Sequence, residues 1–146
     1  MQELVELTVD ECLDLLAGGV VGRVAMATPM GPRIVPVNYV MNEDAILFRT
    51  TPYSELGTYG WNTDLAFEID HLDYDRHQGW SVMAVGRAEL IEDPEELRDI
   101  RAHWDPAPWA TGRRHLYIRL RWRDVTGRKV GTDWDQRRTL PVHQAL

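Results

Sequence analysis

The sequence predicts a mainly β protein: an antiparallel barrel or sandwich of six strands with two or three short helices. Six segments with β-branched or alternating apolar residues follow one another at short spacing. Turn residues, and not long helices, separate most of these segments. The chain has 146 residues, which is the size of one domain and is enough to bury a core without disulfides or metals.

The composition indicates a globular protein in a reducing compartment. The net charge is −7, the opposite of the balance usual in nucleic-acid binding, so we expect no nucleic-acid partner. No apolar stretch approaches the roughly 20 residues that cross a bilayer. The N-terminal MQELVELTVDE lacks the layout of a signal peptide. Cys12 is the single cysteine, so no internal disulfide is possible, and we expect a cytoplasmic protein with no membrane partner.

The first predicted element is a helix over about residues 9–17. Thr8 and Glu11 fit a capping box, in which each side chain bonds the backbone N–H of the other residue. Leu13 and Leu16 give the helix one apolar stripe, and two glycines follow it.

After this helix the apolar period changes to two, which predicts strands. The predicted strands are VVGRVAMAT (20–28), RIVPVNYVM (33–41), AILFRT (45–50), DLAFEID (64–70), GWSVMAVGRAELI (79–91) and HLYIRLRWRDV (115–125). The turn Pro29-Met30-Gly31-Pro32 joins the first two as a hairpin. A second helix is predicted over 93–104, with Asp93 as its N-cap and Pro94 at its first position.

The segment FRTTPYSELG (48–57) carries a pattern typical of anion binding. Arg49 offers a forked cation that suits phosphate. Thr50, Thr51 and Ser54 add hydroxyl groups. Ser54 is also placed to cap one turn of helix, whose free N–H groups favour anions. A capped helix beside a solvated arginine is the alternative interpretation.

Pro36 lies in the middle of the second predicted strand. Proline cannot donate to a β-ladder, so this residue belongs at a sheet edge or an interruption. A ligand that approaches the backbone there would find Asn38 and Tyr39 beside it. An edge strand with nothing bound is the alternative.

The segment DHLDYDRHQGWS (70–81) has aspartates and histidines that invite a metal interpretation. Gln78 stands where a calcium loop needs glycine, and Ala84 stands where it needs glutamate. No paired histidines have the spacing of zinc ligands. We therefore expect a solvated acidic loop and no metal, with Trp80 and Ser81 beginning the next strand. Spacing also assigns no Ser–His–Asp or Cys–His set, so no catalytic residue is proposed.

The order of these segments resembles a known family. A short helix is followed by GRVAM, RIVPVNYV, ILFRTTPYSEL, AFEID, GWSVMAVGRAEL and TGRK. This order resembles the pyridoxamine 5′-phosphate oxidase-like family of FMN-binding split barrels, in particular its small bacterial branch with nitroimidazole-resistance-type proteins. The resemblance covers roughly residues 5–130. It implies a six-stranded split-barrel domain over 1–130, a C-terminal tail over 131–146, and a homodimer with FMN in a cleft between subunits.

The resemblance also implies the site residues and the function. The flavin ring would lie along Pro36, Val37, Asn38 and Tyr39. The ribityl phosphate would be held by Arg49, Thr50, Thr51, Ser54 and Leu56. Trp80 and Ser81 would close the site. The implied function is that of an FMN-binding oxidoreductase with a small-molecule substrate.

One position departs from the family pattern. The family often reads Gly-Ser-Lys-Leu where this chain reads Tyr-Ser-Glu-Leu over residues 53–56. A carboxylate beside a phosphate repels it, so we expect Glu55→Lys to tighten FMN binding.

A non-catalytic module that binds a flavin, a deazaflavin or haem on the same split barrel is the alternative function. Haem needs an axial ligand, for which the candidates are His71, His77 and His115. A deazaflavin has a more anionic tail, for which the arginines of the last strand could supply a basic groove.

Overall fold

The computed structural model of the chain describes residues 3–106, 109 and 116–131. The elements in chain order are β1 (Leu4–Glu6), α1 (Val9–Ala17), β2 (Val21–Thr28), β3 (Gly31–Asn42), β4 (Ala45–Thr50), α2 (Glu55–Tyr59), β5 (Thr63–Asp73), β6 (Gln78–Leu90), α3 (Pro94–His103) and β7 (Leu116–Val130). No helix in these ranges is long and apolar enough to cross a membrane.

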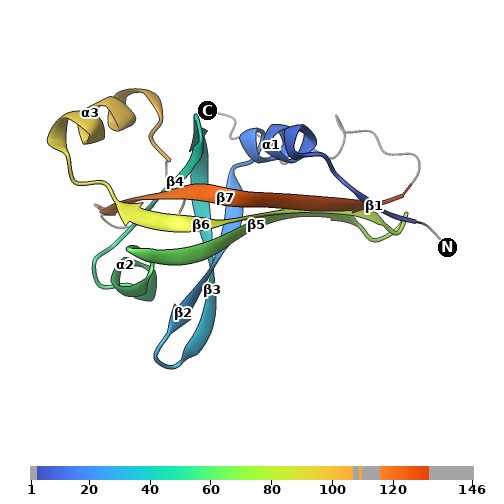
Figure 1. Cartoon of the computed structure of the whole chain (residues 1–146), viewed down its shortest axis with the longest axis horizontal. Helices are drawn as coiled ribbons and strands as arrows, with labels where there is room; N and C mark the ends of the chain where they lie inside the picture. The colour runs from blue at the N-terminus through green and yellow to red at the C-terminus, as the bar shows by residue number, and fades with distance from the viewer. Residues whose placement is uncertain (1–2, 107–108, 110–115, 132–146) are drawn as a thin grey trace.

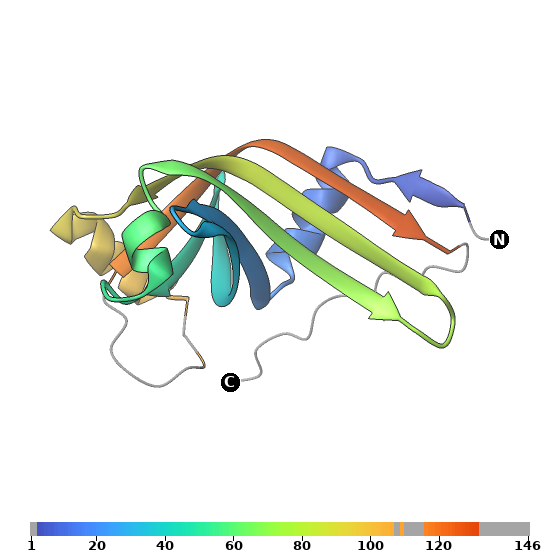
Figure 2. The ribbon, with the colours of Figure 1, turned by 90° about the horizontal axis from the view of Figure 1, so that it is seen from below.

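The strands of the described ranges form one antiparallel barrel. Their order is β1-β7-β4-β3-β2-β5-β6, and a further pairing of β6 with β7 closes the ring. Strands β2 to β7 make up this ring, and β1 is an extra short strand on β7. The β2–β3 ribbon crosses the long strands β5, β6 and β7, which lie side by side (Figures 1 and 2). The predicted six-stranded antiparallel split barrel is therefore confirmed.

The two longer helices begin where the sequence predicts. In α1, Glu11 N donates to Thr8 Oγ1 at 3.2 Å and Thr8 N donates to Glu11 Oε1 at 3.0 Å, so the capping box is present. In α3, the Asp93 carboxylate accepts from the N–H of Glu95, and Pro94 opens the helix. Both helices are confirmed, and the sequence could predict their starts because capping depends on residues two or three positions apart and not on the tertiary fold.

The loop predicted between the strands 64–70 and 79–91 is shorter than expected, because both strands extend into it. β5 continues to Asp73 and β6 begins at Gln78. The Asp73 carboxylate accepts the backbone N–H groups of Asp75 and Arg76, both at 3.1 Å, and this fixes a tight turn. The segment is polar because this ribbon exposes side chains to solvent, which hides the strand period in the sequence.

The predicted end of the last strand at residue 125 is also wrong, since β7 continues to Val130. Its last residues pair on one side with β1, where Leu4 lies opposite Val130, and on the other side with β6, where Gly79 lies opposite Val130. Two ladders of backbone hydrogen bonds outweigh the polar composition of this segment. His115 and the tail after Gly131 lie outside the described residues.

Two apolar clusters show which side chains of a strand face into the barrel and which face out. The larger cluster fills the barrel and includes Ile46 and Phe48 of β4. The smaller cluster lies outside the barrel wall and joins Leu47 of β4 and Tyr117 of β7 to Ile100 of α3. Alternate residues of a strand face opposite sides. The outer face of β4 and β7 is therefore covered by α3, and this face positions the candidate site.

Candidate functional site

The barrel is open between the first half of β3 and β4. β3 pairs with β2 over 31–38 but with β4 only over Tyr39–Asn42. Pro36 lies opposite Arg23 of β2 and has no partner in β4. It therefore occupies an edge position, as the sequence predicts for a residue without a backbone N–H.

Asn38 and Arg49 lie next to each other at the point where the β3–β4 ladder ends. The last pair of this ladder is Tyr39 with Phe48, so Asn38 and Arg49 are the next residues on the two strands. Asn38 Oδ1 accepts the backbone N–H of Trp109 at 2.8 Å. Its Nδ2 is buried and has no hydrogen-bond partner within the described part of the chain.

An orphaned buried donor costs roughly 1–3 kcal/mol, so the Asn38 amide group is a place where an acceptor on a ligand would be bound favourably. A flavin ring carries such acceptors, namely its carbonyl oxygens and ring nitrogens. The residues present at this edge therefore fit the ring of a flavin.

Arg49 is not the solvated arginine of the alternative interpretation, because its side chain is only 20% exposed. Its Nη1 donates to the two carboxylate oxygens of Asp105 at 3.2 and 3.4 Å. Its guanidinium lies over the ring of Tyr117, 4.9 Å from the centroid. The Tyr117 hydroxyl donates to the same Asp105 carboxylate at 3.2 Å. Sequence reasoning missed Asp105, because no local pattern shows that the chain after α3 returns to the end of β4.

The predicted phosphate hydroxyls are joined to each other at the β4–α2 turn. Ser54 Oγ donates to the carbonyl of Thr51 at 2.9 Å and accepts the N–H of Gly57 at 2.9 Å. Since Ser54 has one hydroxyl proton, Thr50 must be the donor in the 2.7 Å contact between Thr50 Oγ1 and Ser54 Oγ. Ser54 therefore caps α2, as predicted, and Leu56, which is 2% exposed, packs in the barrel core.

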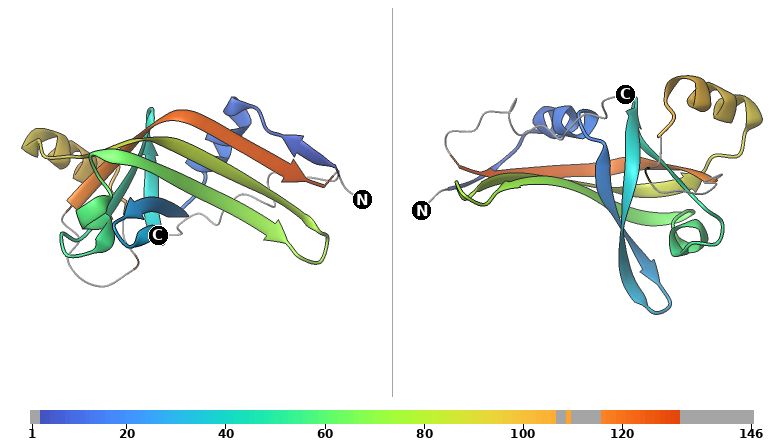
Figure 3. Two further views of the ribbon diagram at one scale, coloured as in Figure 1. Left: turned by 60° about the horizontal axis from the view of Figure 1, so that its bottom comes forward. Right: turned by 180° about the vertical axis from the view of Figure 1, so that it is seen from behind.

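Glu55 is paired in a way that the sequence does not show. Its Oε2 lies 3.4 Å from Arg33 Nε on β3. The Glu55 side chain is 41% exposed and that of Arg33 is 40% exposed. The hairpin tip of the β2–β3 ribbon lies on the same side of the long strands as α2, and Arg33 is near this tip (Figure 3). Glu55 is thus a neutralised charge, and not an isolated anion.

The four residues predicted along the flavin ring do not share one face. Val37 packs against the barrel core. Tyr39 is 3% exposed, donates its hydroxyl to the Leu16 carbonyl at 2.6 Å and meets Phe67 edge-on, and burial raises the pKa of its phenol. The two inward residues alternate with Pro36 and Asn38, as the period of a strand requires. Contacts of Val37 and Tyr39 with a ligand on the outer face are thereby limited to their backbone.

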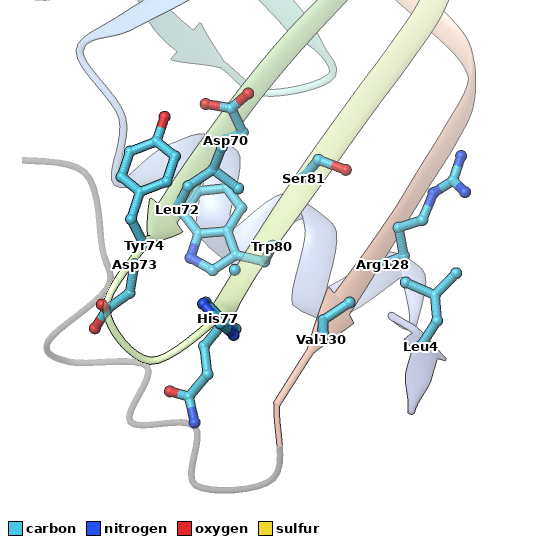
Figure 4. Close-up of a pocket in the computed structure, with 12 residues that line it drawn as sticks. Leu4, Asp70, Leu72, Asp73, Tyr74, His77, Trp80, Ser81, Arg128 and Val130 are labelled. Carbon is cyan, nitrogen blue, oxygen red and sulfur yellow. The ribbon is translucent and has the colours of Figure 1, made fainter. Parts of the chain in front are cut away.

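Trp80 and Ser81 lie in a different place from Arg49. They line a pocket of about 520 Å³ at the β5–β6 hairpin, beside Asp70, Tyr74 and Arg128 (Figure 4). Figure 1 shows this hairpin near β1, at the opposite end of the long strands from α2 and α3. Trp80 is 1% exposed and its ring stacks with that of His71 at 6.5 Å. One chain therefore does not bring all the predicted site residues together.

The three arginines predicted to line one face of the last strand are paired with carboxylates. Arg119 pairs with Glu89 and Glu96. Arg121 pairs with Asp44 and also with Glu89, and Arg123 pairs with Asp64. These pairs do not provide the basic groove that a deazaflavin tail would favour.

No group of three or more His, Cys, Asp and Glu side chains that could hold a metal is found where the structure describes the chain.

The architecture and the open β3–β4 edge define the class of the protein, a split β-barrel. A family model described as pyridoxamine 5′-phosphate oxidase matches residues 8–129. The chain belongs to this pyridoxamine 5′-phosphate oxidase-like family of split barrels.

Similar proteins agree with this assignment. Rv0080 of Mycobacterium tuberculosis, an uncharacterised protein, is 29% identical over 137 residues, which are 90% of this chain and 89% of the relative. The structure of the FAD binding protein from Mycobacterium smegmatis is 29% identical, covers 86% of this chain and 98% of its own, and has a TM-score of 0.71. A conserved protein of unknown function from Corynebacterium diphtheriae is 28% identical, with 88% and 98% coverage and a TM-score of 0.72.

Proposed function

We propose that this chain binds a flavin at the open edge between β3 and β4 and acts as an FMN-binding oxidoreductase on a small molecule. The observation that carries the proposal is the buried Asn38 Nδ2, which has no hydrogen-bond partner among the described residues and lies next to Arg49. An amide donor suits the acceptor atoms of the ring, and a guanidinium suits the phosphate. When bound, the flavin would supply hydride or electron transfer, and the chain would bind and orient it.

FMN is the flavin that the family resemblance implies, and FAD is the second candidate. The similar protein from Mycobacterium smegmatis is an FAD binding protein, which favours a flavin in this chain as well. Both flavins have the same ring and a phosphorus group on the ribityl chain, which is a terminal phosphate in FMN and part of a diphosphate in FAD, so Asn38 and Arg49 are proposed to contact the same parts of either flavin. Heat release and chromatography of the cofactor from the purified protein identify which flavin it holds.

A homodimer is part of the proposal, because Trp80 and Ser81 can close the site only if a second subunit provides them. The hairpin that carries them also exposes apolar side chains, among them Leu72 at 53% and Tyr74 at 80%. Such patches mark association surfaces. A cytoplasmic location is proposed with it, since Cys12 is fully buried and the chain has no second cysteine.

A non-catalytic binding module on the same barrel is the competing proposal, with haem as its main alternative ligand. His71 is held against Trp80, and His77 lies in the hairpin turn next to it, so neither lies at the Asn38–Arg49 edge. With either of these two ligands, haem would need a separate site at the hairpin; His115, the third candidate, lies outside the described residues.

The test is the visible spectrum of the purified protein, followed by flavin titration. We expect a flavin band, and an FMN dissociation constant that rises roughly ten- to hundredfold in Arg49→Ala, since a charge-assisted bond is worth about 1.5–3 kcal/mol. Arg123→Ala is the matched control, because Arg123 pairs with Asp64 on the barrel surface. A Soret band, or equal FMN binding by Arg49→Ala and Arg123→Ala, overturns the site. Turnover of a reduced nicotinamide with an acceptor separates an enzyme from a module.

A further inference from the structure

We infer that Asp105 is an internal counterion of the proposed cofactor site, which the phosphate of the cofactor displaces from Arg49. The inference rests on the proposed function. It concerns a residue outside the predicted site, and it assigns to that residue the control of cofactor affinity.

The Asp105 carboxylate sits in a set of donors suited to an anion. Arg49 Nη1 contacts both of its oxygens, and the Tyr117 hydroxyl donates to Oδ1. Tyr117 is 2% exposed, so its hydroxyl is held in position by the packing beneath α3. The guanidinium of Arg101 lies 5.3 Å from the centre of the same ring, which adds positive charge to this place. A carboxylate thus occupies the position that Arg49 would offer to a phosphate.

A second contact ties the same part of the chain to the other proposed ligand group. The backbone N–H of Trp109 donates to Asn38 Oδ1 at 2.8 Å. Asp105 and Trp109 therefore contact the two side chains, Arg49 and Asn38, on which the proposed flavin site depends. Two described residues that follow α3 thus make polar contacts with the β3–β4 edge.

Asp105 and a cofactor phosphate cannot both hold these donors without a cost. Two anions within about 4 Å of one another repel strongly in a partly buried place, where the effective dielectric constant is well below that of water. The Arg49 and Asp105 side chains are 20% and 35% exposed, so solvent screens this repulsion only in part. The phosphate has the larger charge and more acceptor oxygens, and it therefore displaces the carboxylate.

The sign of one substitution tests the inference. In Asp105→Asn the competing charge is gone, and we expect the FMN dissociation constant to fall about three- to tenfold. Riboflavin, which has no phosphate, should bind both proteins about equally. Asp99→Asn is the matched control, because it also removes one negative charge. Asp99 lies in α3 and contacts His103, and not Arg49. If Asp105 instead held Arg49 ready for the phosphate, Asp105→Asn would weaken FMN binding.

Hydrogen exchange at the Trp109 backbone amide gives a readout that does not depend on affinity. Asp105 and Trp109 are four residues apart, so we expect displacement of Asp105 to weaken the Trp109–Asn38 contact, and FMN should then speed this exchange several-fold in the wild-type protein. Unchanged exchange in a protein saturated with FMN overturns the displacement.

The outcomes separate the two proposals. If the wild-type protein binds FMN and Asp105→Asn binds it equally or more weakly, the inference about Asp105 fails and the proposed function stands. If neither protein binds any flavin, the proposed function fails, and the inference fails with it. FMN binding by Asp105→Asn alone supports both.

Discussion

The two ends of the barrel differ in the side chains that they present. At the end with α2 and α3, the polar side chains predicted to bind phosphate are paired within the chain: Arg49 with Asp105, and Thr50 with Ser54. At the end with the β5–β6 hairpin, apolar side chains remain exposed around a pocket of about 520 Å³. Leu4 is 54% exposed there, and Tyr74 is 80% exposed.

The ends differ in their polar groups and in the pocket, because exposed apolar residues occur at both: Tyr53, beside α2, is 96% exposed. Paired polar groups keep the α2–α3 end stable in the absence of a ligand, and a ligand must compete with these pairs. Exposed apolar groups gain free energy only when another surface covers them. A site built from both ends would therefore need a second subunit, and the following experiments test each end separately.

The largest effect is expected at the hairpin end. Tyr74→Asp places a charge in the proposed subunit interface and should weaken the dimer by about 2 kcal/mol, or roughly thirtyfold in dissociation constant. Tyr53→Asp is the matched control, because Tyr53 is a 96% exposed tyrosine at the other end. Sedimentation velocity measures both variants. Equal dissociation by the two, or a wild-type monomer that still holds flavin stoichiometrically, would contradict the interface.

At the α2 end, Ser54→Ala should lower the free energy of unfolding by about 1–2 kcal/mol. The substitution removes the cap on Gly57 N and leaves the hydroxyl of Thr50, a residue that is 3% exposed, without its acceptor. Urea unfolding followed by tryptophan fluorescence measures the change. Ser81→Ala, at the hairpin pocket, should change stability by no more than about 0.5 kcal/mol. A similar loss in both variants would mean that the Ser54 network is not what stabilises the turn.

The sequence predicts well what depends on near neighbours in the chain. The Thr8–Glu11 box and the edge position of Pro36 follow from the chemistry of single residues or of residues three apart. The partners of Arg49 and Glu55 do not, because Asp105 and Arg33 meet them only after the barrel closes.

The sequence-based prediction also did not account for the face of the strand to which each side chain points. The ordered motif RIVPVNYV correctly indicated the family, but it groups Val37 and Tyr39 with Asn38, although the strand period sends them to opposite faces. The last three residues of β5 and the first residue of β6 were placed in a loop, because most residues over 71–78 are polar.

Glu55→Lys is expected to have a smaller effect than the family pattern implies. The Arg33–Glu55 pair is half exposed, and such pairs contribute about 0–1 kcal/mol. The new lysine lies beside Arg33, so stability should fall by a few tenths of a kcal/mol, and FMN affinity should rise less than fivefold. Thermal unfolding and flavin titration at two salt concentrations measure both quantities. A gain in affinity above tenfold would place Glu55 in direct contact with the phosphate.

The smallest expected effect is a difference between the two ends in how stability depends on pH. Burial raises the pKa of Glu68 on β5 above its ordinary value near 4.5, and the neighbouring Asp70 carboxylate raises it further, although Arg23 opposes them. At the other end, the hydrogen bond from Arg119 holds the pKa of Glu89 below its ordinary value near 4.5, with Arg121 acting in the same direction.

These shifts have opposite consequences for stability. A raised folded-state pKa contributes stability below about pH 4.5, and this contribution is lost as the pH rises through the folded-state value. A lowered pKa contributes stability above about pH 4.5, and this contribution is lost as the pH falls through the folded-state value. The melting temperature of Glu68→Gln relative to wild type should therefore rise between pH 4 and pH 7. That of Glu89→Gln should fall over the same range. If the two differences change in the same direction, the carboxylates at the two ends do not differ in the way that their neighbours indicate.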